Sequence, residues 1–350
     1  MKIAHELKKF ALAASIALIA VPAFAQTTAT TDPVGFITLA LGGTTTSGLT
    51  FSSLGLTRNV SYQGSAETLG VNSLTDNEAT WTDNQFNGAA GAFFVEITSG
   101  PGAGQMYDIT ATAAGSKTIT LSQNLVAGIV APVSFKVRQH WTLASVFGAA
   151  NEGGLTGGTS GTADQVLVYN GTGYDTFYYS NGGLVGAGWR KIGSSPANLS
   201  QANTVLYPED GLLVKRLGTT ATNVVLMGSV KIGQTSIAVS AGINIVSNVY
   251  ASGQTLASSG LYTGSATTGL APGTAGAADQ LLIWNQATSG YDTFYYSSGG
   301  LVGAGWRKVG SSPANADQSA VALPVASSLI INRKNVTAFN WVAPQHPATL

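Results

Sequence analysis

The residues best suited to chemistry occur twice in this sequence, as an aspartate that follows a tyrosine and precedes a Trp-Arg pair. An aromatic ring can cover the apolar face of a sugar while a carboxylate accepts hydrogen bonds from its hydroxyls. The alternative is a purely structural Asp–Arg pair across neighbouring strands, flanked by core aromatic residues. The predicted ligand-binding residues are Tyr174, Asp175, Trp189 and Arg190, and in the second copy Tyr291, Asp292, Trp306 and Arg307.

Paired carboxylates also raise the question of catalysis, because two of them serve as acid and base in glycoside hydrolysis. Asp164 with Asp175, and Asp279 with Asp292, supply such pairs. Aspartates beside strands more often stabilise turns, and the sequence has no Gly-x-Ser-x-Gly elbow and no phosphate-binding loop. We therefore predict a protein that is not an enzyme, with no catalytic residue and no cofactor.

A cluster of oxygen ligands is the one hint of a metal. Asp76, Glu78 and Asp83 lie close together in Thr75–Asn87. Calcium prefers such hard oxygen ligands, although the spacing does not match an EF-hand loop. Calcium is therefore retained as a candidate ligand of these three residues, with Asx-rich turns as the alternative.

The elements that must position the duplicated residues belong to an internal repeat. Gly173–Asn198 returns at Gly290–Asn315 with 24 of 26 positions identical. Alternating residues predict a hairpin of Gln165–Tyr169 with Asp175–Ser180, and a third strand at Trp189–Ile192. We expect the hairpin to turn at Asn170-Gly171 in a tight type I′ turn. Each copy therefore contains a three-strand meander.

The rest of the chain shows the same pattern of short strands separated by glycine. This pattern predicts an all-β fold of two related halves, each sandwich-like or barrel-like, with few short helices, the clearest at Trp141–Phe147. The predicted organisation is a signal peptide at 1–25, a first half at 26–222 with an inserted segment near 65–130, and a second half at 223–350 that contains the repeated meander.

The first 25 residues predict export. Lys2, Lys8 and Lys9 precede an apolar run at Ala11–Val21, and Ala23-Phe-Ala25 fits signal peptidase cleavage. Removing this segment leaves 13 basic and 15 acidic residues, a balance that argues against a nucleic-acid partner. The chain has no cysteine, and only 9% of its residues are charged. We expect a location in the periplasm, on the outer surface or outside the cell.

Several short motifs support a resemblance. Asp32-Pro-Val-Gly-Phe-Ile-Thr38 follows the predicted signal peptide, and Thr-Leu-Ala-Ser and Trp-Arg-Lys-(Ile/Val)-Gly each occur twice. With these motifs the chain resembles a family of exported bacterial proteins of unknown function. The resemblance implies export and β-structure, and it supplies no catalytic residues.

Three functional hypotheses follow. The first is an exported, non-enzymatic β-protein with a structural or interaction role that binds protein or glycan at the cell surface, and whose edge strands support self-association. The second is an outer-membrane β-barrel, which we favour less because the chain ends without an aromatic strand. The third is a secreted glycan-active enzyme.

Overall fold

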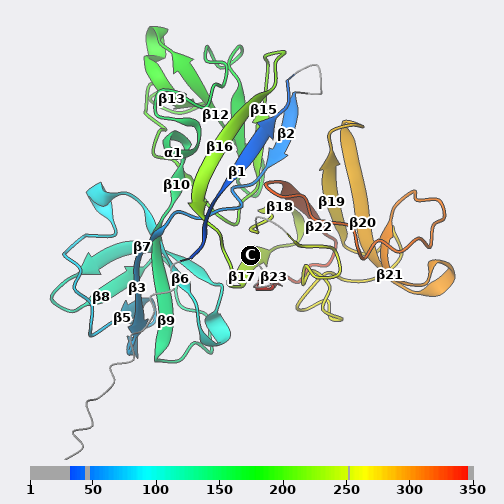
Figure 1. Cartoon of the computed structure of the whole chain (residues 1–350), viewed down its shortest axis with the longest axis horizontal. Helices are drawn as coiled ribbons and strands as arrows, with labels where there is room; N and C mark the ends of the chain where they lie inside the picture. Colours follow the sequence, from blue (N-terminus) through cyan, green and yellow to red (C-terminus); the bar gives the residue numbers. More distant parts are fainter. Residues whose placement is uncertain (1–31, 44–47, 251–252, 346–350) are drawn as a thin grey trace, which may run out of the picture. The chain divides into compact units, whose positions relative to one another are not determined.

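The computed structural model describes residues 32–43, 48–250 and 253–345. The predicted signal peptide lies outside these residues. The described chain is all-β: its named strands pair antiparallel throughout, and its single α-helix is α1 (Leu143–Phe147) (Figure 1). Within the described residues, no helix is long and apolar enough to cross a membrane.

The first repeat consists of a five-stranded sheet and a separate strand pair. The sheet has the order β13-β12-β11-β15-β2, and the pair is β1 with β16. Two further short strands, β10 and β14, pair with each other beside α1. The bounds are β1 (Val34–Leu41), β2 (Leu49–Ser52), β10 (Trp141–Thr142), β11 (Gln165–Tyr169), β12 (Tyr174–Asn181), β13 (Ala187–Lys191), β14 (Val205–Leu206), β15 (Leu212–Lys215) and β16 (Thr222–Ser229).

The second repeat has the corresponding strand order. Its sheet is β18-β22-β19-β20-β21, and its pair is β17 with β23, so that β18 answers β2, β22 answers β15 and β23 answers β16. Because β16 pairs with β1, residues 222–229 belong to the first repeat, beyond the boundary placed at 222 from the sequence. The bounds are β17 (Thr235–Val239), β18 (Gly242–Ser247), β19 (Gln280–Asn285), β20 (Gly290–Ser298), β21 (Ala304–Lys308), β22 (Ser328–Arg333) and β23 (Phe339–Ala343).

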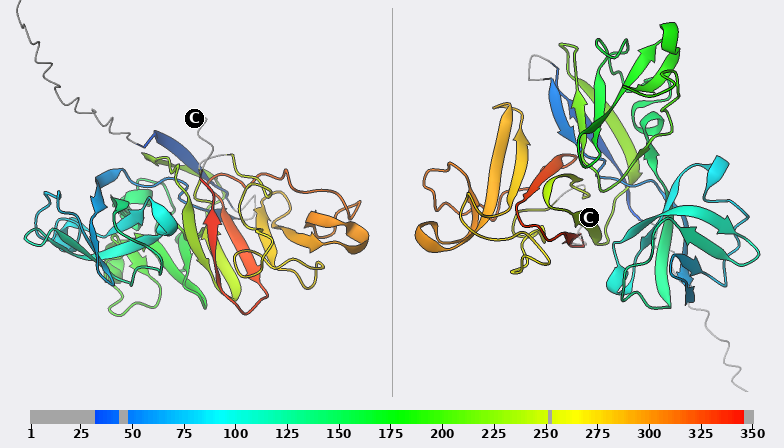
Figure 2. Two further views of the ribbon diagram at one scale, coloured as in Figure 1. Left: turned by 90° about the horizontal axis from the view of Figure 1, so that it is seen from below. Right: turned by 180° about the vertical axis from the view of Figure 1, so that it is seen from behind.

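An insert interrupts the first repeat between β2 and β10. It forms a seven-stranded sheet of order β3-β9-β6-β7-β8-β5-β4. β3 and β4 are the two edge strands of this sheet, yet only one residue separates them along the chain. The sheet therefore curls round its own core. The bounds are β3 (Val60–Ala66), β4 (Thr68–Leu69), β5 (Ser73–Thr75), β6 (Phe93–Ile97), β7 (Met106–Ala113), β8 (Thr118–Leu121) and β9 (Val133–Gln139). Figure 2 shows these elements from two other directions.

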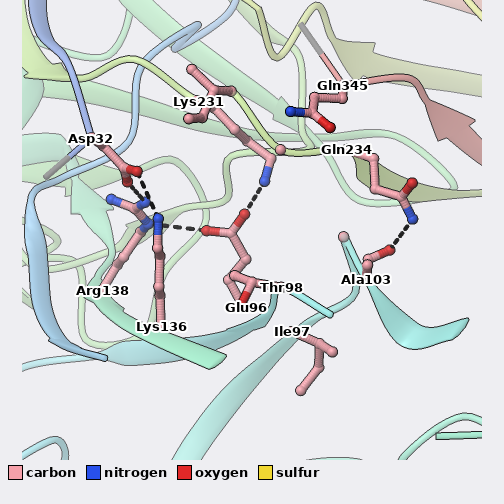
Figure 3. Close-up of a pocket in the computed structure, with 13 residues that line it drawn as sticks. Asp32, Glu96, Ile97, Thr98, Ala103, Lys136, Arg138, Lys231, Gln234 and Gln345 are labelled. Atoms are coloured by element: carbon pink, nitrogen blue, oxygen red, sulfur yellow. Dashed lines mark hydrogen bonds and ion pairs between the residues drawn. The ribbon is translucent and has the colours of Figure 1, made fainter. Parts of the chain in front are cut away.

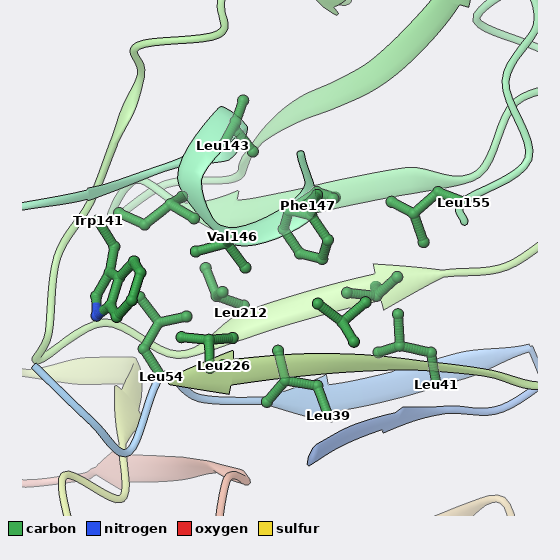
Figure 4. Close-up of a cluster of buried hydrophobic side chains, with 14 of the residues drawn as sticks. Leu39, Leu41, Leu54, Trp141, Leu143, Val146, Phe147, Leu155, Leu212 and Leu226 are labelled. Atoms are coloured by element: carbon green, nitrogen blue, oxygen red, sulfur yellow. The ribbon is translucent and has the colours of Figure 1, made fainter. Parts of the chain in front are cut away.

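Each repeat is sandwich-like because its strand pair and its five-stranded sheet share one apolar core. In the first repeat, Leu39 of β1 and Leu226 of β16 pack in the same cluster as Phe147 and Leu212 (Figure 4). Alternation along each strand directs these side chains to one face. Trp306 and Trp341 lie in the equivalent core of the second repeat.

The outer faces of the two five-stranded sheets also share a cluster. Phe51, Leu213, Ile245 and Ile330 are buried together, 5 to 7% exposed. Phe51 on β2 corresponds to Ile245 on β18, and Leu213 on β15 to Ile330 on β22. The two repeats therefore contact one another through equivalent surfaces, as the subunits of a symmetric dimer do.

The predicted type I′ turn is wrong in its placement. Tyr169 pairs with Tyr174, and the Asn170 N–H donates to the Gly173 carbonyl, which places Gly171 and Thr172 at the centre of the turn. Gly171 has φ +91°, whereas Asn170 remains in the ordinary region and its Oδ1 accepts from the Gly173 N–H at 2.9 Å. The side-chain acceptor of Asn170 therefore favours a turn one residue further along the chain.

Candidate functional site

The duplicated aspartate and Trp-Arg pair do not form one binding face. Phe177 pairs with Lys191 and Tyr179 with Trp189, so Asp175 and Trp189 lie on the face of the sheet that covers the core. Side chains alternate along strands, which places Tyr174 and Arg190 on the opposite face. The same pairing separates Asp292 and Trp306 from Tyr291 and Arg307 in the second repeat.

The expected pairing of each aspartate with the arginine of the Trp-Arg motif is also wrong, because the aspartate pairs with the lysine that follows that arginine. Lys191 Nζ lies 2.7 Å from Asp175 Oδ2, and Lys308 Nζ lies 2.7 Å from Asp292 Oδ1. The hydrogen bond from Lys191 lowers the pKa of Asp175 below its usual value. These carboxylates belong to partly exposed salt bridges.

Arg190 and Trp189 have structural partners. Arg190 donates to the carbonyls of Val185, Ala187 and Trp189 at 2.8 to 2.9 Å, which ties down the glycine-rich loop before β13. Gly188 permits this close approach, since its φ is +121° and a Cβ there would lie 3.2 Å from Arg190 Nη1. Trp189 is completely buried and its Nε1 donates to the Gly148 carbonyl. No aromatic platform is left for a sugar at this position.

Arg307 repeats the arrangement in the second half. It donates to the carbonyls of Val302, Ala304 and Trp306 at 2.8 to 2.9 Å. Trp306 is 3% exposed. The two nearly identical blocks therefore share the same three hydrogen bonds from the arginine to backbone carbonyls.

The three candidate calcium ligands are not brought together as a metal site. Asp76 is buried, and its two carboxylate oxygens accept from the Tyr62 hydroxyl at 2.6 Å and the Glu78 N–H at 2.9 Å. Asp83 accepts from the Ala114 N–H at 2.7 Å. No group of three or more metal-ligating side chains is found in the part of the chain that the structure describes. These acidic residues stabilise turns and loops.

A polar cleft that the motifs did not indicate lies where the insert and both repeats meet. It has a volume of about 430 Å³, within the range of small-ligand sites. Its lining combines two carboxyl groups with amides, hydroxyls and one aromatic ring. These are Glu209, Asp210, Gln105, Gln123, Asn244, Asn340, Ser236, Ser240 and Tyr169, and we call it the Glu209 cleft.

The two carboxyl groups of the Glu209 cleft resist ionisation. Burial, reinforced by the neighbouring charge of Asp210, raises the pKa of Glu209 to about 7. Burial raises the pKa of Asp210 to about 6. Glu209 Oε2 is buried and has no hydrogen-bond partner among the described residues. At neutral pH Glu209 therefore exists as both acid and carboxylate and can donate or accept a hydrogen bond.

A second cavity, of about 270 Å³, surrounds a cluster of buried charges (Figure 3). Arg138 on β9 bonds Asp32 and also Glu96, whose Oε2 lies 3.1 Å from Arg138 Nε. Lys136 Nζ lies 2.6 Å from Asp32 Oδ1, and Lys231 bonds Glu96. We call these five residues the Arg138 cluster.

The charges of the Arg138 cluster support one another. Burial disfavours the charged form of Glu96, but Lys231 and Arg138 outweigh burial and lower its pKa. Lys136 and Arg138 likewise outweigh burial and lower the pKa of Asp32. The cluster therefore keeps three cations and two anions in an interior where isolated charges are costly.

Sequence reasoning missed both sites because each is assembled from residues that lie far apart in the sequence. The cleft carboxylates lie in the loop between β14 and β15, where Glu209-Asp210 has no repeat counterpart or motif. The Arg138 cluster joins residues up to 199 positions apart, from Asp32 to Lys231. The sequence of β9, VSFKVRQ, alternates apolar and polar residues, so Lys136 and Arg138 read as part of an exposed polar face and gave no signal of burial.

Comparison of the chain with protein-family models, with curated proteins and with solved structures finds no match.

Proposed function

We propose that this chain is an exported, non-enzymatic β-protein that binds a neutral glycan in the Glu209 cleft. The observation that carries the proposal is the lining of that cleft, in which two carboxyl groups, four amides and three hydroxyls surround about 430 Å³. Each sugar hydroxyl both donates and accepts hydrogen bonds, which suits a lining of mixed donors and acceptors.

The charge of the cleft restricts its ligand. Glu209 and Asp210 supply the only ionisable carboxylates of its lining among the described residues, and no lysine or arginine lines it. An anionic ligand would therefore be repelled as these carboxyl groups ionise, whereas a neutral or amino sugar would not. Tyr169 contributes a ring that can pack on apolar sugar surface.

The proposal replaces the duplicated Asp-Trp-Arg residues as the binding site and retains the non-enzymatic role. Glu209 is half-buried and its Oε2 has no hydrogen-bond partner among the described residues, which suits recognition of a hydroxyl, because a ligand group placed there satisfies a polar atom left without a partner. Export remains part of the proposal and is supported by the basic and apolar segments of the first 25 residues.

The test is a glycan array followed by calorimetry at pH 8, where both carboxyl groups are mainly ionised, on residues 26–350 with Asp210→Asn and Glu209→Gln. We expect one class of neutral glycan to bind, and each substitution to weaken it about tenfold or more, as expected for loss of a hydrogen bond to a charged group. Asp175→Asn removes a carboxylate outside the cleft and is the matched control, with unchanged affinity.

Two results would contradict the proposal. One is equal affinity of the wild type and both cleft variants for every glycan that binds. The other is release of sugar from the bound glycan that Glu209→Gln abolishes, which would identify a glycan-active enzyme instead.

A further inference from the structure

The Arg138 cluster has more positive charge than its own acidic residues neutralise. Lys136, Arg138 and Lys231 face only Asp32 and Glu96 in the cavity lining, which leaves a net charge of about +1 when all five are ionised. Arg138 and Lys231 have side chains that are 2% and 3% exposed, so solvent does little to screen this charge.

The cluster also has hydrogen-bond donors to spare. A lysine ammonium has three N–H donors. Each of the two lysines is bonded to one carboxylate oxygen: Lys136 to Asp32 and Lys231 to Glu96. Arg138 is more fully used, because it donates to Asp32, Glu96 and the Arg58 carbonyl.

The cavity beside these donors limits the size of a ligand. Its volume of about 270 Å³ lies just below the range of roughly 300–1,000 Å³ that drug-sized ligands occupy. Lys136 is 21% exposed and lies at the boundary with solvent. Neutral polar side chains, Thr98, Gln234 and Gln345, complete the lining. This combination fits a small anion that enters beside Lys136 and reaches Lys231.

We infer that the cavity of the Arg138 cluster binds a small oxyanion, of the size of phosphate, sulfate or a carboxylate, between the ammonium groups of Lys136 and Lys231. Such an anion neutralises the excess charge and accepts the spare N–H donors. The inference is independent of glycan binding, since the Glu209 cleft shares no lining residue with this cavity.

The experiment measures binding of inorganic phosphate by equilibrium dialysis, at constant ionic strength set with chloride. We expect saturable binding of one phosphate per chain. Competition by sulfate but not acetate would identify a tetrahedral anion, and competition by acetate as well would identify a general oxyanion site. Lys136→Gln should weaken phosphate about tenfold or more, because it removes one charged donor.

Two further variants separate binding from stability. Lys191→Gln removes a partly exposed lysine elsewhere and should leave phosphate binding unchanged. Glu96→Gln should tighten it several-fold, since it raises the net charge of the cluster and releases Lys231 from its partner. A merely structural role for the cluster predicts no such gain.

The inference is overturned if wild-type protein binds no phosphate above the chloride background. It is also overturned if Lys136→Gln and Lys191→Gln bind phosphate equally. Should Lys136→Gln fail to fold, as judged by circular dichroism, the dialysis of wild type and the gain in Glu96→Gln still decide the outcome.

Discussion

Arg216 Nε lies 2.8 Å from Asp164 Oδ2, and both side chains are almost wholly buried, at 5% and 0% exposed. Asp164 also accepts from the backbone N–H groups of Thr156 and Leu217 at 2.6 Å. Arg333 and Asp279 form the equivalent pair in the second repeat. In the first repeat this buried ion pair links the loop before β11 to the end of β15. In the second repeat the equivalent pair links the loop before β19 to the end of β22.

Asp164→Asn should lower the free energy of unfolding by about 3–5 kcal/mol, because it leaves a buried arginine without its counter-charge. Denaturant titration measures this loss. Asp175→Asn is the matched control: its salt bridge with Lys191 is about one-third exposed, so its loss should cost at most about 1 kcal/mol. Equal losses in the two variants would contradict the assignment of Asp164 as the structural anchor.

Arg190→Lys should loosen the glycine-rich loop while leaving the sheet intact. A lysine retains the charge but lacks the planar guanidinium that reaches three carbonyls at once. We expect faster amide hydrogen exchange across 182–188 and a loss of roughly 1–3 kcal/mol, the cost of leaving buried acceptors unpaired. Unchanged exchange in this segment, measured by mass spectrometry, would show that Arg190 does not hold the loop.

The regular part of the fold was predictable because it depends on local patterns. Alternation indicated the hairpin Gln165–Tyr169 with Asp175–Ser180, and the structure confirms it as β11 with β12. Trp141–Phe147 was predicted as a short helix, and α1 occupies Leu143–Phe147. Strands with little apolar alternation were missed, notably β3, whose sequence is VSYQGSA.

The candidate site was less predictable, because it depends on which face each side chain takes and on long-range partners. The sequence identified Asp175 correctly as a charged strand residue, but one step of register decides whether Arg190 or Lys191 meets it. Glu209 became notable only when strands from three parts of the chain surrounded it. Neither the face that a side chain takes nor its long-range partners can be read from the spacing of residues in the sequence.

Phe51→Ala should weaken the contact between the two repeats. Phe51 is 5% exposed, and its ring centroid lies 5.2 Å from that of Trp284 and 5.6 Å from that of Tyr291. Truncation should cost about 3–5 kcal/mol in denaturant titration, the usual cost of a buried phenylalanine. Phe36→Ala, at a position 72% exposed, should cost less than about 0.5 kcal/mol. A similar cost in both variants would contradict a packed contact between the repeats.

Glu209 should make the protein less stable as pH rises. Its pKa is about 7 in the folded chain against an ordinary value of 4.5, so the folded state binds more protons than the unfolded state between these values. Stability contributed by the protonated group is fully present below about pH 4.5 and is lost as pH rises through about 7.

Glu209→Gln mimics the protonated form and should abolish this part of the pH dependence. The variant should therefore exceed the wild type in unfolding free energy at pH 8, by on the order of 3 kcal/mol at 1.36 kcal/mol per pKa unit, and the difference should shrink towards pH 4. Parallel stability curves for the two proteins from pH 4 to pH 8 would show that Glu209 is ionised freely in the folded chain.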